Sequence, residues 1–168
     1  MSRAFVKEPD SPPDEVLERP QSEHANYITP EGLEQLRARL KSLEARRDAL
    51  GDVTEDPKRQ QQLAELERDI HYFQGRIDRA VVVDPASQSG DEVLFGAMVE
   101  VRDHEGKTQE FAIVGEDEAD AAGGKVSWVS PLAKAMFGAR VGDVVTWQRP
   151  AGNVELEITA IRYPPARA

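Results

Sequence analysis

Three carboxylates lie close together in a short polar stretch near the middle of the chain. Asp52, Glu55 and Asp56 all fall within residues 51–57. Clustered carboxylate oxygens are the ligands that hard cations such as Mg²⁺ prefer, and a metal held in this way can activate an attacking water. From the pattern alone, a solvated turn with helix-capping acids is the favoured interpretation. The basic pair Lys58-Arg59 follows at once and could hold the acids in ion pairs, but exposed pairs are weak and do not decide the matter.

The residues on both sides of this acidic stretch are patterned for helices. Apolar side chains recur there in alternating steps of three and four, which is typical of the narrow seam of a coiled coil. Two such segments joined by a short breaker predict an antiparallel helical hairpin over residues 27–80, with arms of about twenty residues and roughly 30 Å in length. The predicted seam consists of Leu33, Leu36, Leu40, Leu43 and Leu50 before the acids and Leu63, Leu66, Ile70, Phe73 and Ile77 after them.

Helix-capping signals set the bounds of the two arms. Thr29 followed by Pro30 predicts the start of the first arm, and Gly51 predicts its end. Thr54 or Asp56 is the expected cap of the second arm. Two arms of equal length place the apex near Asp56 and the proline after it, so that Glu55 and Asp56 are at least as well placed as Asp52.

The rest of the chain predicts an α+β protein with its main core after residue 80, because a two-helix hairpin buries too little apolar surface to serve as one. We expect an extended or disordered segment at 1–26, a linker at 81–91 and a compact sheet domain at 92–165. The alternating patterns there predict one short helix at 132–137, capped by Ser130, and five strands, at 94–101, 108–114, 125–129, 144–148 and 154–163.

Composition excludes several classes of protein. The 168 residues carry a net charge of -10, which argues against a protein that wraps nucleic acid by itself. The chain has no cysteine, which excludes disulfides and thiolate metal sites. It has no apolar run long enough to span a membrane and no signal peptide, so we expect a cytoplasmic protein.

With the hairpin, the acidic stretch and the sheet domain in this order, residues 27–163 resemble the Gre transcript-cleavage factors of bacterial RNA polymerase, GreA and GreB. The acidic stretch 51–56 is similar to the family's Gly-Asp-Leu-x-Glu-Asn. The most specific matches are Phe95-Gly96-Ala97, the segment 113–120, the segment 130–136 that begins Ser-Pro-Leu, and Gly142-Asp143.

The resemblance implies an accessory factor that is not itself an enzyme. It implies a C-terminal domain similar in fold to FK506-binding proteins, which docks at the rim of the polymerase secondary channel through the region of Ser130, Pro131 and Leu132. The hairpin would pass down the channel and stimulate cleavage of backtracked RNA. Asp52 and Glu55 would then hold metal and water, with Asp56 as the third acid of the tip.

The same resemblance predicts the partners. The chain would have no cofactor of its own and would share the Mg²⁺ of the polymerase active site. Its partner would be bacterial RNA polymerase, with nascent RNA met only through the polymerase, no membrane and no independent specific DNA binding.

Two departures from the family pattern leave alternatives open. The first arm reaches Gly51 sooner than in the family, and Asp56 followed by proline replaces the family's asparagine, without the usual aromatic residue shortly after it. An acidic N-terminal extension is a further addition. A Gre-fold regulator that binds polymerase without supporting cleavage is therefore the first alternative. A protein-binding or chaperone module with an isomerase-like domain is the second, although core packing is the favoured role for the aromatic residues that would line its pocket: Phe95, Phe111, Trp128 and Trp147.

The remaining charged residues suggest no further site. Glu116, Asp117, Glu118 and Asp120 have no recognisable calcium-ligand spacing, and an acidic surface loop is expected. His24, His71 and His104 predict no metal site. Contact with channel walls or RNA is possible for the arginines of the hairpin, but solvated flanks of the coiled coil are favoured for all six: Arg37, Arg39, Arg46, Arg47, Arg68 and Arg76.

Overall fold

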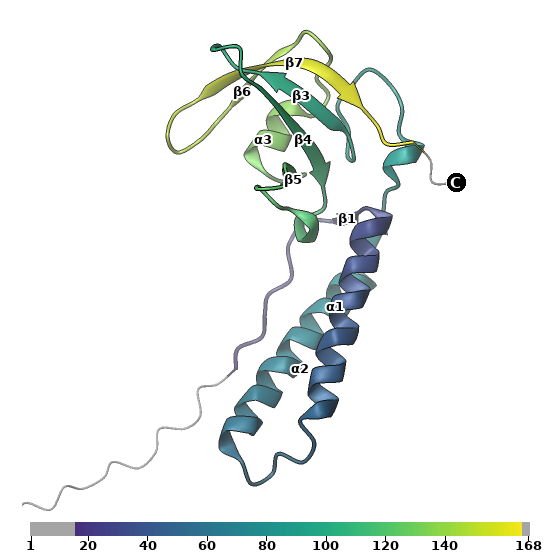
Figure 1. Cartoon of the computed structure of the whole chain (residues 1–168), viewed down its shortest axis with the longest axis vertical. Helices are drawn as coiled ribbons and strands as arrows, with labels where there is room; N and C mark the ends of the chain where they lie inside the picture. Colours follow the sequence, from purple (N-terminus) through teal and green to yellow (C-terminus); the bar gives the residue numbers. More distant parts are fainter. Residues whose placement is uncertain (1–15, 166–168) are drawn as a thin grey trace, which may run out of the picture.

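The computed structural model describes residues 16–165 and has an α+β fold. Two long helices, α1 (Pro30–Ala49) and α2 (Pro57–Asp78), lie side by side as the two predicted arms of the hairpin. Together they form one projection from a sheet domain, and from here on the term arm means both helices (Figure 1). The loop between them lies at the end of the arm far from the sheet. Of the extended or disordered segment predicted at 1–26, residues 1–15 lie outside the described residues, and residues 16–25 have no regular secondary structure.

The arm is held together by the predicted seam. Leu36 and Leu43 of α1 and Leu66, Ile70 and Phe73 of α2 are buried in one cluster. The other predicted seam residues lie partly buried against this cluster, except Leu63, which lies close to the loop and outside it. The step pattern therefore identified the buried face of both helices, because residues three and four apart share one side of a helix.

Both helices begin as the capping signals predict. The Thr29 hydroxyl accepts a hydrogen bond from the Gly32 amide at 3.0 Å, and Pro30 occupies the first helical position. At the start of α2 the cap is Asp56, followed by Pro57. Gly51 has a φ of 63°, the left-handed conformation that ends a helix without steric cost only in glycine.

A two-stranded parallel ribbon at the base of the arm was not predicted. Strand β1 (Asn26–Ile28) pairs with β2 (Ala80–Val82). The predicted boundary between the hairpin and the linker, between residues 80 and 81, therefore falls inside β2. The ribbon holds together the residues just before α1 and just after α2. A short 3₁₀ helix, η1 (Pro85–Ser87), follows within the predicted linker and is capped by Asp84.

The sheet domain has the predicted five strands and one helix. The strands are β3 (Met98–Arg102), β4 (Thr108–Val114), β5 (Lys125–Ser127), β6 (Val144–Trp147) and β7 (Val154–Arg162). Their order in the sheet is β5-β4-β3-β7-β6, with β4 and β5 parallel and the other pairs antiparallel. Helix α3 (Pro131–Met136) contributes Leu132, Ala133 and Met136 to the core.

The first strand of this sheet starts at Met98 and not at Leu94. The preceding residues are held by the chain beyond α3, since the Val93 amide donates to the Ala139 carbonyl at 2.9 Å. Aromatic residues behave as core material: Phe95 is buried, and the others pack on the core from partly buried positions, namely Phe111, Trp128 and Trp147. None of the helices in the described part of the chain is both long and apolar enough to span a membrane.

Candidate functional site

The loop at the end of the arm, residues 50–56, forms the tip of the arm and has a defined shape. The Asp52 carboxylate accepts hydrogen bonds on Oδ1 from the Thr54 amide, at 2.9 Å, and from the Thr54 hydroxyl. The Asp56 amide donates to the Val53 carbonyl at 3.2 Å, and the Gln60 side chain donates to the Thr54 carbonyl at 2.9 Å. Local hydrogen bonds of this kind hold aspartate-led turns together without a buried core.

These contacts also affect the ionisation of Asp52. The Thr54 hydroxyl, and to a smaller extent the Thr54 amide, hold the pKa of the Asp52 carboxyl below its usual value of 3.8. Both groups donate to the charged form and therefore favour it. Asp52 is thus a carboxylate throughout the neutral range, with Oδ1 occupied by Thr54.

Asp56 has a structural role at the start of α2. Its Oδ1 accepts from the amides of Lys58, at 3.0 Å, and Arg59, at 3.3 Å, and its Oδ2 lies 3.5 Å from Arg59 Nε. The cap satisfies amides that have no partner within the helix. Of the three predicted tip acids, Asp56 is therefore the one whose two oxygens are already engaged.

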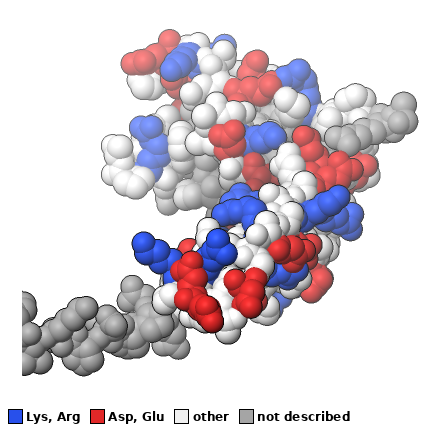
Figure 2. All heavy atoms as spheres, turned by 60° about the horizontal axis from the view of Figure 1, so that its bottom comes forward, with Lys and Arg blue, Asp and Glu red and all other residues white. Residues whose placement is uncertain are grey.

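Glu55 differs from both neighbours. Its side chain is exposed, and within residues 16–165 no hydrogen bond or ion pair engages its carboxylate. Asp56 caps α2 and Pro57 is its first residue, so the turn of the chain lies within 50–56 and the predicted apex near Asp56 falls at the end of this loop. Figure 2 views the molecule with this end brought forward, and acidic and basic side chains stand next to one another there.

The loop alone does not make a metal site. Among the described residues no group of three or more His, Cys, Asp or Glu is placed to hold a metal ion. A hard cation takes six or more oxygen ligands, whereas Asp52 Oδ2 and the Glu55 carboxylate are the oxygens that the tip leaves available. The donor set suits a metal whose remaining ligands come from elsewhere.

The predicted docking residues occupy the start of α3. The Ser130 hydroxyl accepts from the Ala133 amide at 3.2 Å and caps the helix, and Pro131 is exposed. Leu132 is only 3% exposed and belongs to the core of the sheet domain. The surface offered to a partner at this point is therefore that of Pro131, and Leu132 supports it from below.

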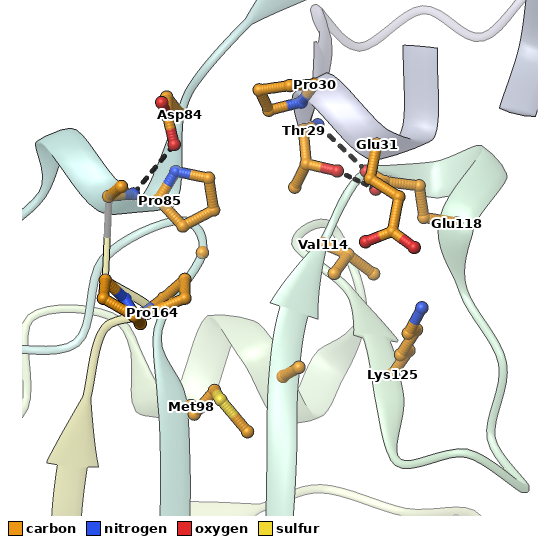
Figure 3. A pocket seen from close by; sticks show the side chains of 14 residues that line it. Thr29, Pro30, Glu31, Asp84, Pro85, Met98, Val114, Glu118, Lys125 and Pro164 are labelled. Carbon is orange, nitrogen blue, oxygen red and sulfur yellow. Dashed lines mark hydrogen bonds between the residues drawn. The ribbon is translucent and has the colours of Figure 1, made fainter. Parts of the chain in front are cut away.

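Of the four acidic residues after β4, Asp120 is exposed as expected, but the other three do not form a solvated loop. They form a short 3₁₀ helix, η2 (Glu116–Glu118), that contacts the base of the arm. Glu118 accepts from the Thr29 amide at 3.1 Å, from the Thr29 hydroxyl and from the Gly115 amide at 2.9 Å (Figure 3 shows the Thr29 contacts). It lies against Gly32, where any Cβ would overlap its carboxylate.

Arg76 also departs from expectation, since it is not a solvated flank of the arm. Its side chain is only 2% exposed, with Nε 2.8 Å from Asp117 Oδ2 and Nη2 2.6 Å from the Asn26 side-chain oxygen. The Asn26 amide group donates in turn to the Arg76 carbonyl at 2.6 Å. The signal in the sequence was its spacing, because Arg76 falls three residues after Phe73 and hence on the buried stripe of α2.

A cavity of about 350 Å³ lies at this same base, between the start of α1, η1 and the sheet (Figure 3). Its lining includes Pro30, Pro85, Met98, Val114 and Pro164. It is at the opposite end of the arm from Asp52 and Glu55, and it therefore has no part in the chemistry of the tip.

The sequence of the chain is similar to those of several known proteins. A family model described as transcription elongation factor GreA/GreB, C-terminal, matches residues 87–163. Transcription elongation factor GreB of Neisseria meningitidis serogroup B is 36% identical over 160 residues, covering 84% of this chain and 96% of the relative. Transcription elongation factor GreA of Sphingopyxis alaskensis is 35% identical over 146 residues, covering 79% of this chain and 92% of the relative.

Among solved structures, GreA factor homolog 1 of Thermus thermophilus is 27% identical and covers 83% of this chain and 99% of its own. The TM-score between the two structures is 0.40. The sequence relatives identify the family of the chain, because their identity to it exceeds 30% over nearly their whole length. The chain belongs to the GreA/GreB family of transcription elongation factors.

Proposed function

We propose that this chain binds bacterial RNA polymerase in the cytoplasm and stimulates the polymerase's own cleavage of backtracked RNA. The observation that carries the proposal is the position of two available carboxylates, Asp52 and Glu55, at the far end of a two-helix arm. With 20 residues in α1, a rise of 1.5 Å per residue makes this arm roughly 30 Å long. Such an arm suits the delivery of side chains into a channel.

In this proposal the sheet domain docks at the rim of the secondary channel. Pro131 supplies an exposed contact on the rigid start of α3, where the Ser130 cap and the buried Leu132 hold the backbone in place. The likeness to FK506-binding proteins that the family resemblance implies for this domain would concern its shape alone and would imply no isomerase activity. Nascent RNA is then met only inside the polymerase.

The tip contributes oxygen ligands and orientation. A Mg²⁺ ion of the polymerase active site would supply the activation of water, as metals do in two-metal phosphoryl chemistry. Asp52 offers Oδ2 while Thr54 holds Oδ1, which fixes the direction of the carboxylate. Glu55 has both oxygens available for a metal or a water.

One observation favours the alternative of a channel regulator that does not support cleavage. Both carboxylate oxygens of Asp56 are engaged at the start of α2, and Oδ1 of Asp52 accepts hydrogen bonds from Thr54. The tip therefore has fewer available oxygens than its three acids suggest. A factor with this tip could occupy the channel and leave the active site without a second metal. The two functions predict the same binding, but only the first predicts that cleavage is accelerated.

The deciding experiment uses a stalled elongation complex with RNA labelled at its 5′ end. We expect the protein to accelerate cleavage, and the double substitution Asp52→Asn with Glu55→Gln to abolish the acceleration while binding to polymerase persists. Glu67→Gln is the matched control, because it removes one charge from an exposed position of α2 away from the tip. It should behave as the native chain does.

Three other results would change the conclusion. Binding without any acceleration of cleavage would establish the regulator. Unchanged acceleration in the double variant would show that Asp52 and Glu55 are not the residues responsible. A pull-down that recovers no polymerase subunit would favour a binding or chaperone module that needs no polymerase.

A further inference from the structure

Residues 16–25 have no regular secondary structure, yet they lie along the arm, as Figure 1 shows beside α2. The Arg19 guanidinium lies 3.9 Å from the centroid of the Tyr72 ring, and its Nη1 lies 3.3 Å from Asp69 Oδ1. A stacked and paired guanidinium makes a directional contact as well as an electrostatic one. Arg19 therefore attaches this segment to one face of α2.

Gln21 makes the second attachment, and α2 is shaped to receive it. The Gln21 amide group donates to the Tyr72 carbonyl at 3.0 Å. Gly75 lies directly beneath, where a Cβ would stand 2.8 Å from Gln21 Nε2. Glycine within a helix costs about 1 kcal/mol relative to alanine. Apart from Pro57 at its first position, the helix thus has its weakest helix-forming residue at the place where the segment crosses it.

The third attachment is to the sheet domain. The Ser22 hydroxyl donates to Glu116 Oε1 at 3.0 Å, and the Arg76 guanidinium lies 3.6 Å from Glu116 Oε2. Nearby, the His24 ring stands edge-on to Trp128, with centroids 6.0 Å apart. One short segment therefore contacts the middle of α2 at Arg19 and the sheet domain at Ser22, and it crosses the junction between them.

We propose that residues 16–25 form an intramolecular brace that sets the direction of the arm relative to the sheet domain. Arg19, Gln21 and Ser22 are positioning residues in this brace. A brace acts by geometry: a domain docked at a channel rim delivers the tip to one point only if the arm keeps one direction. The consequence for cleavage rests on the proposed function, whereas the brace itself is a property of the free protein.

The test measures the direction of the arm without polymerase. The chain has no cysteine, so spin labels can be placed at Ser42→Cys on α1 and Thr108→Cys on β4, both exposed positions. Pulsed dipolar spectroscopy then reports the distribution of distances between arm and sheet. We expect a single narrow distribution in the native chain, and one about twofold broader in Arg19→Ala with Gln21→Ala, because two of the three attachments are lost.

A matched control lies in the same segment. Glu18 and Glu23 are exposed, and Glu18→Ala with Glu23→Ala should leave the distribution narrow. A second variant, Ser22→Asp, places a carboxylate against Glu116 and should broaden the distribution through like-charge repulsion. Arg19→Lys, with Gln21 intact, retains the charge toward Asp69 but loses the planar guanidinium that stacks on Tyr72, and its distribution should be intermediate between those of the native chain and the double variant.

The outcomes separate this proposal from the proposed function. If both the double variant and Ser22→Asp keep the native distribution, the brace is wrong, whatever the cleavage assay shows. If the distribution broadens and no form of the protein stimulates cleavage, the brace stands and the cleavage function fails. Where both hold, the double variant should lower the maximal cleavage rate and leave the half-saturating concentration unchanged, since the docking surface is untouched.

Discussion

Acidic residues gather at both ends of the arm, and their surroundings differ. At the base, Asp117 pairs with the buried Arg76, and Glu118 accepts hydrogen bonds at the start of α1. At the tip, Glu55 faces solvent and Asp52 has one oxygen unoccupied by the chain. The neighbours of a carboxylate therefore decide its role. Where amides and a guanidinium surround it, it stabilises a junction, and where they do not, it is available to a partner.

The largest expected effect is the loss of the buried cation at the base. Arg76→Met leaves Asp117 and Asn26 without their partner, and removing one member of a buried pair costs about 3–5 kcal/mol. Urea denaturation measures the free energy of unfolding. Arg37→Met, at an exposed position of α1, should change it by less than about 0.5 kcal/mol. Equal effects of the two substitutions would remove the distinction between a buried and a solvated arginine.

A smaller effect at the base should follow from Gly32→Ala. Alanine favours a helix over glycine, but here its Cβ would displace the Glu118 carboxylate from Thr29. We expect a net loss of about 1–3 kcal/mol, because buried polar groups lose their partners.

Gly75→Ala is the control for that substitution, because the Cβ would meet only the end of the Gln21 side chain, which can move. Its free energy of unfolding should stay within about 1 kcal/mol of the native value. A stabilised Gly32→Ala protein would show that the Glu118 contact does not hold the arm.

At the tip, the acids should separate by role. Asp56→Ala removes the cap of α2 and should cost about 1 kcal/mol of unfolding free energy. The double substitution Asp52→Asn with Glu55→Gln should stay within about 0.5 kcal/mol of the native chain, since such exposed sites contribute little. Thermal unfolding of the three proteins compares them directly. A large loss of unfolding free energy in the double variant would mean that Asp52 and Glu55 stabilise the loop and are not available to a partner.

The smallest effect concerns the ionisation of Asp52. Thr54→Val removes the hydroxyl that holds the pKa of Asp52 below 3.8 and keeps the Thr54 amide, so the pKa should rise part of the way back. The depressed pKa means that the contact stabilises the fold above pH 3.8 and loses this effect as pH falls through the folded-state pKa. An NMR titration of the Asp52 carboxyl measures the change. An unchanged pKa would show that the hydroxyl is not the group that holds it.

Local sequence determined much of this protein. The three-and-four spacing of Leu36, Leu43, Leu66 and Ile70 identified the seam, since helical periodicity depends only on the chain itself. Thr29 and Ser130 capped the helices they were predicted to cap, because a cap acts on amides two or three residues away. The five strands and the α+β class followed from alternation in the same way.

Tertiary structure alone decided which partner each buried charge meets and which acids are available. Arg76 and Asp117 are 41 residues apart, and nothing local to either one shows that they meet. The parallel pairing of β1 with β2 likewise joins segments more than fifty residues apart. Parallel strands are not connected by a short turn, so no turn signal in the sequence predicts the pairing. The three acids at the tip looked alike in the sequence, and the start of α2 engaged Asp56 while leaving Glu55 exposed. The reason is physical: the role of a carboxylate depends on the donors within about 3 Å of it, and folding brings those donors from distant parts of the chain.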